Sequence, residues 1–569
     1  MAAVLLRHRF LLLIVLVALA LLAGVGLRDP QPADEPRFVL AAERMVESGQ
    51  WLLPHRGHEL YAEKPPTFMW LLASAQSLTG DWRSAFLLPS WLAALLTLGL
   101  TWDLARRLWS PRIAAHAALA LFVCLQFGLQ AKRAQIDMVL VAMTTLSLWA
   151  LCRYLLLRRD WRLLLLGTFA AGLGTVTKGV GFLPLLVFLP WLLVRRRQAV
   201  VASPASAWSW HLLAGIGGFL LGVGVWLLPL GVALLAGNDP ALRGYAAELL
   251  FKQTGTRYAN PWHHVRPAWY YLQVMATLWL PGAALLPWML PAWRRRVRRM
   301  DARFVLLLGW SLLVLLFFTL SPGKREVYIF PALPALCLAA APLLPVLLRR
   351  RGPRLVLAAW LLLLAVLALA IGLSAWPQQA PWLATQVARR GMDAASVASL
   401  GGWLLLLGGG LLALLAWSRL RRIGTAVVVG TALLWSVYGI GLMPAVDADS
   451  SARAIMRQAG ERIGPEAELG LLAWREQHLL QANRELGRPV AEFGFKRPWE
   501  LQWQDAARWL AEAPGRRWLF VLEDALGPCV ERAHAEPIGV SNRRTWWLVP
   551  GTAVRAGCTV PPFAPEPPE

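Results

Sequence analysis

The sequence predicts an all-α polytopic membrane protein with about thirteen transmembrane helices, followed by a small C-terminal α/β soluble domain. Two features of the composition support this prediction: charged residues make up only 16% of the 569 residues, and hydrophobic residues make up 57%. A third is that long apolar runs recur as far as residue 443. Soluble domains carry about 25% charged residues, so most of this chain must face lipid or other apolar side chains.

Thirteen apolar runs precede residue 444, and most of them are about 20 residues long, enough to cross a hydrocarbon core of about 30 Å. They are 10–27, 84–104, 111–130, 135–157, 163–177, 179–194, 212–236, 269–291, 304–320, 327–348, 355–376, 400–417 and 423–443. The fifth and sixth runs are short and meet at Lys178, so they could be two spans or one broken or re-entrant segment. The first run also fits a cleaved signal peptide, but its apolar stretch is longer than usual for one.

The formal net charge of +24 indicates membrane topology rather than a nucleic-acid partner, because the basic residues cluster between apolar runs. With thirteen spans, seven arginine clusters fall on one side of the membrane. These clusters are Arg7 and Arg9; Arg106, Arg107 and Arg112; Arg158, Arg159 and Arg162; 195–197; 294–299; 349–354; and Arg419, Arg421 and Arg422. The positive-inside rule then places the N-terminus in the cytoplasm. The opposite side receives loop 28–83, loop 237–267 and the tail. We therefore expect a membrane domain over 1–444 and a non-cytoplasmic α/β domain over 445–569.

The tail is predicted to be α/β because short apolar runs alternate with amphipathic stretches. Strands are expected at 468–474, 518–522 and 546–549, and helices at 474–486 and 499–513. Cys529 and Cys558 both lie on the non-cytoplasmic side, where a disulfide could form. Cys124, Cys152 and Cys337 lie in apolar runs, where cysteine usually packs as a small apolar residue.

The first outer loop opens with Asp34, Glu35 and Pro36, which predict a helix start, and Gly49 can close that helix. Its apolar residues fall on one face, so the helix is expected to lie in the plane of the membrane interface. Asp34 could be only a helix cap. A carboxylate directly after a span is also where a polar acceptor could meet a lipid-borne donor.

Four groups of basic residues run against the positive-inside rule and lie on the outer side: Lys64, Lys132 with Arg133, Lys178, and Lys324 with Arg325. Positive charge held at membrane depth needs an anionic partner, and a lipid phosphate is the obvious one. Any one of these lysines could instead simply extend its ammonium to the interface.

Asp137 begins an otherwise apolar run, and an ionisable residue inside a membrane span is by default a candidate functional residue. Its structural alternative is an ion pair with Lys132 or Arg133. The adjacent His263 and His264 point in different directions on any regular backbone, so at most one is an easy metal ligand. A solvated loop histidine is the simpler interpretation of that pair.

These residues resemble the opening of the lipid A aminoarabinose transferases, within the wider protein O-mannosyltransferase-like superfamily of GT-C glycosyltransferases. The resemblance rests on motifs that occur in the same order and at the same spacing over 7–345. They are Asp34-Glu35-Pro36-Arg37-Phe38; 45–55; Tyr61-Ala62-Glu63-Lys64-Pro65; Val176-Thr177-Lys178-Gly179; Arg257-Tyr258 with His264 and Pro267; 317–321; and Gly323-Lys324 with Tyr328-Ile329. Phe38 stands where the family usually has Tyr, and the loop 322–326 departs from the aminoarabinose branch.

The resemblance implies an inverting glycosyltransferase of the bacterial inner membrane, with its active site on the periplasmic side. The donor would be a sugar on a polyprenyl phosphate, and the acceptor would be lipid A or another envelope glycan. No nucleotide cofactor is expected, because the donor is already lipid-linked.

The resemblance also implies a role for each matching residue. Asp34 would be the catalytic aspartate and Asp137 the second acidic residue. A divalent metal on Glu63 and His264 is a further implication. The residues expected to hold the donor phosphate are Lys64, Lys178, Lys324, Arg257 and Tyr328.

Two alternatives stay open at this point. The same enzyme class could carry another sugar, such as a hexose or galacturonic acid, or use a protein acceptor. A transporter or flippase of lipid-linked sugars is a different class, favoured by the possible broken helix at Lys178. Against it, the sequence has no internal repeat, and the outer cations all lie on one side.

Overall fold

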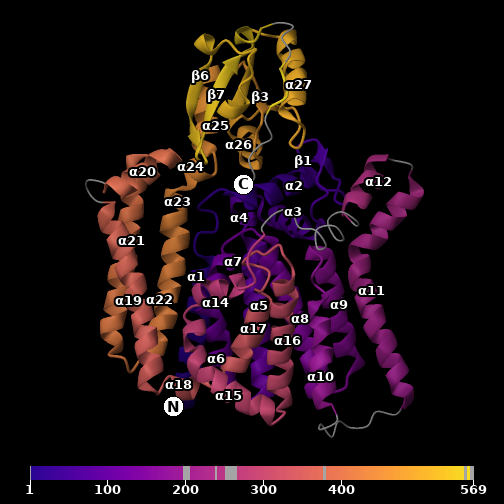
Figure 1. Ribbon diagram of the computed structural model, residues 1–569, viewed down its shortest axis with the longest axis vertical. Coiled ribbons are helices and arrows are strands. Elements are labelled where there is room, and N and C mark those ends of the chain that lie inside the picture. Colours follow the sequence, from indigo (N-terminus) through magenta and orange to yellow (C-terminus); the bar gives the residue numbers. More distant parts are fainter. Residues whose placement is uncertain are drawn as a thin grey trace.

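The computed structural model describes residues 2–195, 205–237, 240–249, 265–375, 380–555 and 560–563, with only the backbone of 2–11 and 205–209. A bundle of long helices carries a smaller α/β domain on one end (Figure 1). The N-terminus lies at the other end of the bundle. Helices α15 and α18, which adjoin two of the arginine clusters, lie near that same end. The α/β domain therefore lies at the end of the bundle opposite these two arginine clusters.

Each predicted apolar run coincides with one helix or with consecutive helical segments. They are α1 (Ala2–Leu22), α5 (Leu88–Leu108), α6 (Pro111–Phe122), α7 (Leu125–Ala131), α8 (Ile136–Leu156), α9 (Trp161–Lys178), η1 (Leu183–Val187), α10 (Phe188–Val194), α11 (Ala205–Ala236), α14 (Tyr270–Leu278), η3 (Gly282–Leu285), α15 (Leu286–Arg298), α16 (Ala302–Leu320), α17 (Ala332–Ala340), α18 (Leu344–Leu347), α19 (Arg351–Ser374), α21 (Ala394–Ser418), α22 (Ile423–Val437) and η4 (Tyr438–Leu442). Among the described residues, seven helices are long and apolar enough to cross a membrane, or up to nine if each bent pair counts as one. The count of thirteen stays a prediction.

Two of the spans are sharply bent. Helices α6 and α7 meet at 72°, and α14 meets the segment Gly282–Arg298 at 100°. The two bends touch, because the Leu125 backbone N–H donates to the Leu280 carbonyl at 3.2 Å. Pro281 lies at the second bend and has no backbone N–H to continue a helix.

The chain reverses after Lys178, so the fifth and sixth runs are not one continuous span. Helix α9 ends at Lys178, and Gly179 follows with a φ of +69°. Gly181 then packs so closely on Gly174 that a Cβ at position 181 would lie 1.9 Å from the Gly174 carbonyl carbon. Only glycine allows this approach, and Lys178 is therefore placed at the tip of a tight helical hairpin.

The first outer loop folds into short elements at the same end as the α/β domain. They are α2 (Glu35–Ser48), β1 (His55–Arg56), β2 (Glu59–Leu60), α3 (Thr67–Thr79) and α4 (Trp82–Ala85). Helix α2 begins and ends where the sequence predicts, with Gly49 in the left-handed conformation at its C-terminus. Its position in the plane of the membrane interface stays a prediction, and its apolar residues are buried because it packs on α3 and on α26 of the tail.

The tail contains a five-stranded sheet of order β4-β3-β5-β7-β6, in which β3 pairs in parallel with β4 and β5, and β7 pairs antiparallel with β5 and β6. The three predicted strands and two predicted helices are all present. Its elements are α23 (Met443–Ala445), α24 (Asp447–Ser450), α25 (Arg453–Ile463), β3 (Glu468–Leu472), α26 (Glu476–Leu486), β4 (Ala491–Glu492), α27 (Trp499–Glu512), β5 (Arg517–Leu522), η5 (Glu523–Ala525), η6 (Arg532–His534), β6 (Glu536–Ser541), β7 (Arg544–Pro550) and η7 (Gly551–Ala553). The boundary predicted at 444 falls inside α23, and the division into domains stays a prediction.

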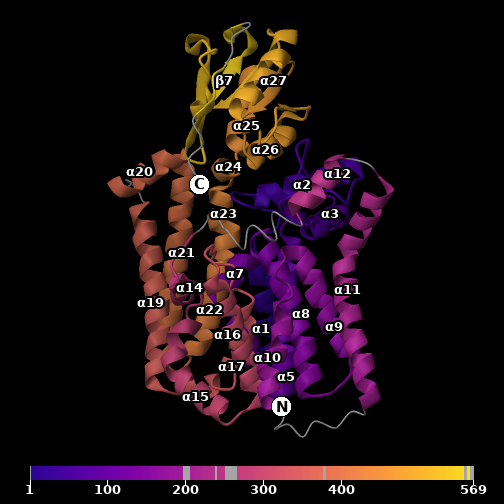
Figure 2. The same cartoon turned by 45° about the vertical axis from the view of Figure 1, so that its right-hand side comes forward.

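Two further helices, α12 (Pro240–Ala247) and α20 (Pro381–Arg390), lie near the end of the bundle that carries the tail (Figure 2). Cys529 is disulfide-bonded, and Cys558 lies outside the described residues. The cysteines at 124, 152 and 337 are free and buried, as predicted.

Candidate active site

The two adjacent carboxylates at the start of α2 have different roles. Glu35 is buried and forms a bidentate pair with Arg28, with N–O distances of 2.5 and 2.7 Å. It also accepts the backbone N–H groups of Gln31 and Ala134. The Glu35 carboxylate is therefore engaged in bonds within the loop and in one bond to the bundle at Ala134, which leaves Asp34 as the carboxylate available for chemistry.

Asp34 occupies the N-cap position of α2, but its side chain makes no capping hydrogen bond. Its Oδ2 instead accepts from Gln135 Nε2 at 2.9 Å and from Arg325 Nη2 at 3.4 Å. Its Oδ1 has only Arg37 Nη1 nearby, at 3.8 Å, among the described residues. One oxygen is thus fixed, while the other has no direct hydrogen bond in the described part of the chain.

Asp137 forms an ion pair with Lys178, the residue at the tip of the α9 hairpin. The alternative pairing with Lys132 or Arg133 is wrong, because the Lys132 ammonium donates to the carbonyls of Leu21 and Ala23. The Lys178 ammonium also lies over the Tyr328 ring, 5.3 Å from its centroid. Two predicted phosphate ligands, Lys178 and Tyr328, are therefore neighbours beside the second acidic residue.

Lys324 and Arg325 point to different places although they are adjacent in the chain. The Lys324 ammonium is buried and donates to the backbone carbonyls of Ser321 and Arg266, at 2.6 and 3.2 Å. Arg325 reaches Asp34. The residue from this loop that contacts the acidic centre is therefore Arg325, which the sequence analysis grouped with Lys324 as an outer cation but did not include among the phosphate ligands.

Electrostatics keep Asp34 charged. Burial raises the pKa of Asp34, but the positive charges of Arg325, Arg37 and Lys178 outweigh it and hold that pKa below the usual carboxyl range. The charge of Lys178 acts on both acidic residues, and Asp137 in turn acts on Arg325. Asp34, Asp137, Lys178 and Arg325 therefore form one electrostatic cluster.

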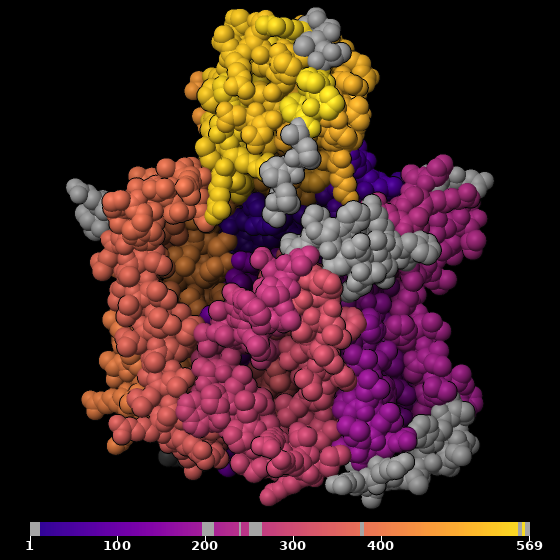
Figure 3. Space-filling view, in the orientation of Figure 1, coloured from indigo at the N-terminus to yellow at the C-terminus, as the bar shows by residue number. Residues whose placement is uncertain are grey.

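A second ionic cluster joins the first loop to the tail. Glu476 of α26 accepts from Arg37 at 3.0 Å and from Arg56 at 3.3 Å. Lys496 Nζ, also from the tail, lies 3.1 Å from Glu63. In Figure 3 the indigo residues of the N-terminal region are visible in the recess beneath the yellow tail domain. Arg37 lies between the two clusters and links the tail to Asp34, because it is near both Asp34 and Glu476.

The described surroundings of Glu63 do not suit a divalent metal. Three cations lie within 4 Å of its carboxylate, namely Arg37, Arg56 and Lys496. Burial raises the pKa of Glu63, but these charges, that of Lys496 first, hold it below the ordinary value. The described residues contain no cluster of three His, Cys, Asp or Glu side chains able to hold a metal. The mechanism proposed below therefore has no step that uses a metal.

Four predicted site residues are not placed against the acidic centre. Arg257 and His264 lie outside the described residues. Lys64 is half-buried in the loop before α3, directly after Glu63, and Lys324 donates to backbone carbonyls. Gln135 and Glu476 were missed by the sequence analysis, because they meet Asp34 and Arg37 across long sequence separations. The local signal for Arg325 was its place beside Lys324 in an outer cation group.

Residues 63–227 match the model of a family described as dolichyl-phosphate-mannose-protein mannosyltransferase. The undecaprenyl phosphate-alpha-4-amino-4-deoxy-L-arabinose arabinosyl transferase of Pseudomonas aeruginosa strain LESB58 is 35% identical over 323 residues, which cover 54% of each chain. A second such transferase, from Sodalis glossinidius, is 33% identical over 338 residues and 58% of each chain. The chain thus spans about half the length of the curated relatives it matches. The predicted resemblance is confirmed by these matches.

The fold is that of ArnT from Cupriavidus metallidurans. Its crystal structure bound to undecaprenyl phosphate superposes with a TM-score of 0.71 at 22% identity, covering 95% of this chain and 97% of that one. The apo structure gives 0.70 at 23% identity, with 98% and 100% covered. The GT-C fold class predicted from the sequence is confirmed, and the chain is a multi-pass membrane protein.

Proposed function

We propose that the chain is an inverting glycosyltransferase that moves a sugar from a polyprenyl phosphate to an acceptor at the periplasmic face of the inner membrane. The observation that supports it is the state of Asp34. Its carboxylate is half-enclosed and kept ionised by cations, one oxygen is anchored by Gln135 and Arg325, and the other has no direct hydrogen bond among the described residues. An ionised carboxylate with one oxygen open to the acceptor can take a proton, as a general base must.

The chemistry follows from the charges of the cluster. Asp34 Oδ1 would take the proton of an acceptor hydroxyl as that oxygen attacks the anomeric carbon and the bond to the phosphate breaks. If the acceptor is itself a phosphate, Asp34 would position the acceptor or the sugar instead. The cations at Lys178 and Arg325 would stabilise the negative charge that develops on the departing phosphate.

The relatives suggest the substrates. Their names specify undecaprenyl phosphate as carrier and 4-amino-4-deoxy-L-arabinose as sugar, which makes this pentose the first donor to test. Lipid A is the first acceptor to test, because the resemblance is to the lipid A aminoarabinose transferases. A hexose, galacturonic acid or a protein acceptor would use the same acidic cluster. Mass spectrometry of lipid A and other envelope glycans from a deletion strain would identify the acceptor.

The decisive experiment reconstitutes the full chain in proteoliposomes with an undecaprenyl-phosphate-linked sugar and measures release of undecaprenyl phosphate. Asp34→Asn is expected to lower the rate by about 10² to 10⁴-fold, the usual contribution of a general base, while donor binding is retained. Asp81→Asn is the matched control. Asp81 is an exposed cap of α4 in the same loop, so its variant should release undecaprenyl phosphate at the parent rate.

Transport of the donor without cleavage would contradict the proposal. If the proteoliposomes move the lipid-linked sugar across the bilayer and release no undecaprenyl phosphate, the chain is a flippase. Full cleavage activity of the Asp34→Asn variant would remove Asp34 from the mechanism.

A further inference from the structure

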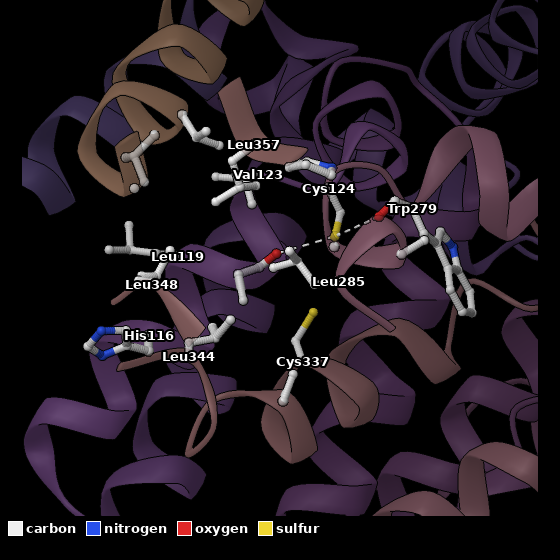
Figure 4. A pocket seen from close by; sticks show the side chains of 18 of the residues that line it. His116, Leu119, Val123, Cys124, Trp279, Leu285, Cys337, Leu344, Leu348 and Leu357 are labelled. Carbon is white, nitrogen blue, oxygen red and sulfur yellow. Dashed lines mark hydrogen bonds between the residues drawn. The ribbon is translucent and has the colours of Figure 1, made fainter. Parts of the chain in front are cut away.

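A separate apolar cavity of about 370 Å³ lies within the helix bundle (Figure 4). The helices α6, α15, α17 and α18 supply much of its wall, and they lie toward the end of the bundle away from the tail domain. The sulfurs of Cys124 and Cys337 point toward each other across it. None of the residues of the Asp34 cluster lines this cavity.

The cavity lies beside two sharp helix bends. Val123 and Cys124 lie at the 72° bend between α6 and α7, and Trp279 and Pro281 lie at the 100° bend after α14. All four residues line the cavity. Packed interiors normally leave few voids larger than a water molecule, so a space of this size is a distinct feature of the bundle.

Two arginines stand at the edge of the cavity. Arg421 and Arg422 belong to the loop between α21 and α22, line the cavity and are exposed. Neither forms an ion pair with a carboxylate among the described residues. Arg422 lies over the Trp417 ring at 5.3 Å, which leaves its hydrogen-bond donors available.

A second basic loop adjoins this edge. A Cβ at Gly424 would contact the Leu348 side chain at 3.3 Å, so the start of α22 touches the end of α18. Arg349, Arg350 and Arg351 follow Leu348 directly and are exposed. The positive-inside rule accounts for arginines in such loops, but it does not account for an apolar cavity that opens beside them.

We propose that this cavity binds an anionic phospholipid of the cytoplasmic leaflet, with one acyl chain inside and the phosphate on Arg421 and Arg422. Basic pockets between transmembrane helices on the cytoplasmic side are where acidic lipid headgroups bind. The apolar walls match an acyl chain, and the uncompensated guanidinium groups match a phosphodiester. The volume suits a single acyl chain and only a small part of an undecaprenyl chain. The inference does not rest on the proposed function.

The test measures lipid binding to the purified full-length protein by native mass spectrometry, with phosphatidylglycerol and phosphatidylcholine as probes. The parent should retain phosphatidylglycerol in preference to phosphatidylcholine. Each arginine near an anionic lipid surface contributes about 1 kcal/mol, so the double variant Arg421→Gln/Arg422→Gln should bind phosphatidylglycerol roughly 10- to 30-fold more weakly. The matched control is Arg389→Gln/Arg390→Gln, which removes two exposed arginines from α20 at the other end.

A variant that fills the cavity without changing charge separates insertion from surface attraction. A Cβ at Gly282 would meet only the Cys124 sulfur, at 3.5 Å, so Gly282→Leu should fold and extend into the cavity. We expect Gly282→Leu to bind phosphatidylglycerol about as weakly as the double arginine variant does.

Four results would overturn the proposal. The first is equal retention of the two lipids by the parent, and the second is unchanged binding in the arginine variant. The third is arginine-dependent binding that Gly282→Leu does not affect, which would place the lipid on the surface alone. Tighter binding of undecaprenyl phosphate than of phosphatidylglycerol, with the same arginine dependence, would show that the assigned occupant is wrong.

Discussion

Two charged regions at opposite ends of the bundle obtain their counter-charge in different ways. At the end that carries the tail domain, Asp34, Asp137 and Glu63 each have cations of the protein beside them. At the other end, Arg421 and Arg422 adjoin an apolar cavity and have no carboxylate partner among the described residues. Folding alone assembles the first region, whereas the second acquires its counter-charge from outside. Substitutions in the first region should therefore change ion pairs within the protein, whereas substitutions in the second should change the binding of lipid.

Removal of Lys178 is expected to have the largest effect on stability. Lys178→Met leaves Asp137 buried without its partner, and breaking a buried pair in this way typically costs about 3–5 kcal/mol. Thermal unfolding in detergent measures the loss. The double variant Asp137→Asn/Lys178→Met should recover most of it, because no unpaired charge remains. If Lys178→Met were as stable as the parent, the ion pair with Lys178 would not be what stabilises the buried charge of Asp137.

Loss of Glu476 comes next. Glu476→Gln weakens charge-assisted hydrogen bonds to Arg37 and Arg56, each in the class worth about 1.5–3 kcal/mol. We expect weaker attachment of the tail, seen as faster proteolysis between bundle and tail, together with slower release of undecaprenyl phosphate. Lys496→Gln is the control, because Lys496 is half-exposed and an exposed ion pair is worth about 1 kcal/mol or less. Equal effects of the two variants would show that Glu476 does not hold the tail more strongly than Lys496 does.

A change at Arg325 should alter the pH dependence of activity. Removing its positive charge destabilises the Asp34 carboxylate, so the pKa of Asp34 rises toward the ordinary carboxyl value. The base form is then lost at a higher pH, and the acid limb of kcat/KM against pH should move upward in Arg325→Gln. Arg44→Gln, which removes one partner of the exposed Arg44–Glu47 ion pair on α2, should leave that limb in place. An unmoved limb in Arg325→Gln would exclude Asp34 as the titrating base.

The smallest effect is expected in the cavity. Cys337→Ala removes one buried sulfur and should cost about 1 kcal/mol, the typical value for a point substitution. Release of undecaprenyl phosphate should stay within about twofold of the parent, since distant sites act independently. A large loss of activity would show that the two ends are coupled.

Local sequence patterns predicted much of the fold. Pro36 and Gly49 marked the ends of α2, and alternating apolar runs located the strands of the tail. The pattern of α2 did not reveal that α26 covers it, because burial by a segment more than 400 residues away leaves no local period. An amphipathic helix was therefore assigned to lipid.

The site was predicted less completely, because its contacts cross the chain. The Asp34 motif and Lys178 were found, but Lys324 and Arg325 could not be told apart from their order alone. The partner of Asp137 was sought among its near neighbours, whereas the hairpin at Lys178 brings that residue in from 41 positions away.

The contact between Glu476 and Arg37 has a consequence for how such chains diverge. Two segments separated by 439 residues carry opposite charges across one joint. Arg37 also lies beside Asp34 and Glu63, and Glu476 also pairs with Arg56, so an exchange of the two charges would set like charges against each other. Natural variants should accordingly keep a base in the loop and an acid on α26. A hybrid that takes its tail from a homologue should work only if that donor supplies an acid at the equivalent place.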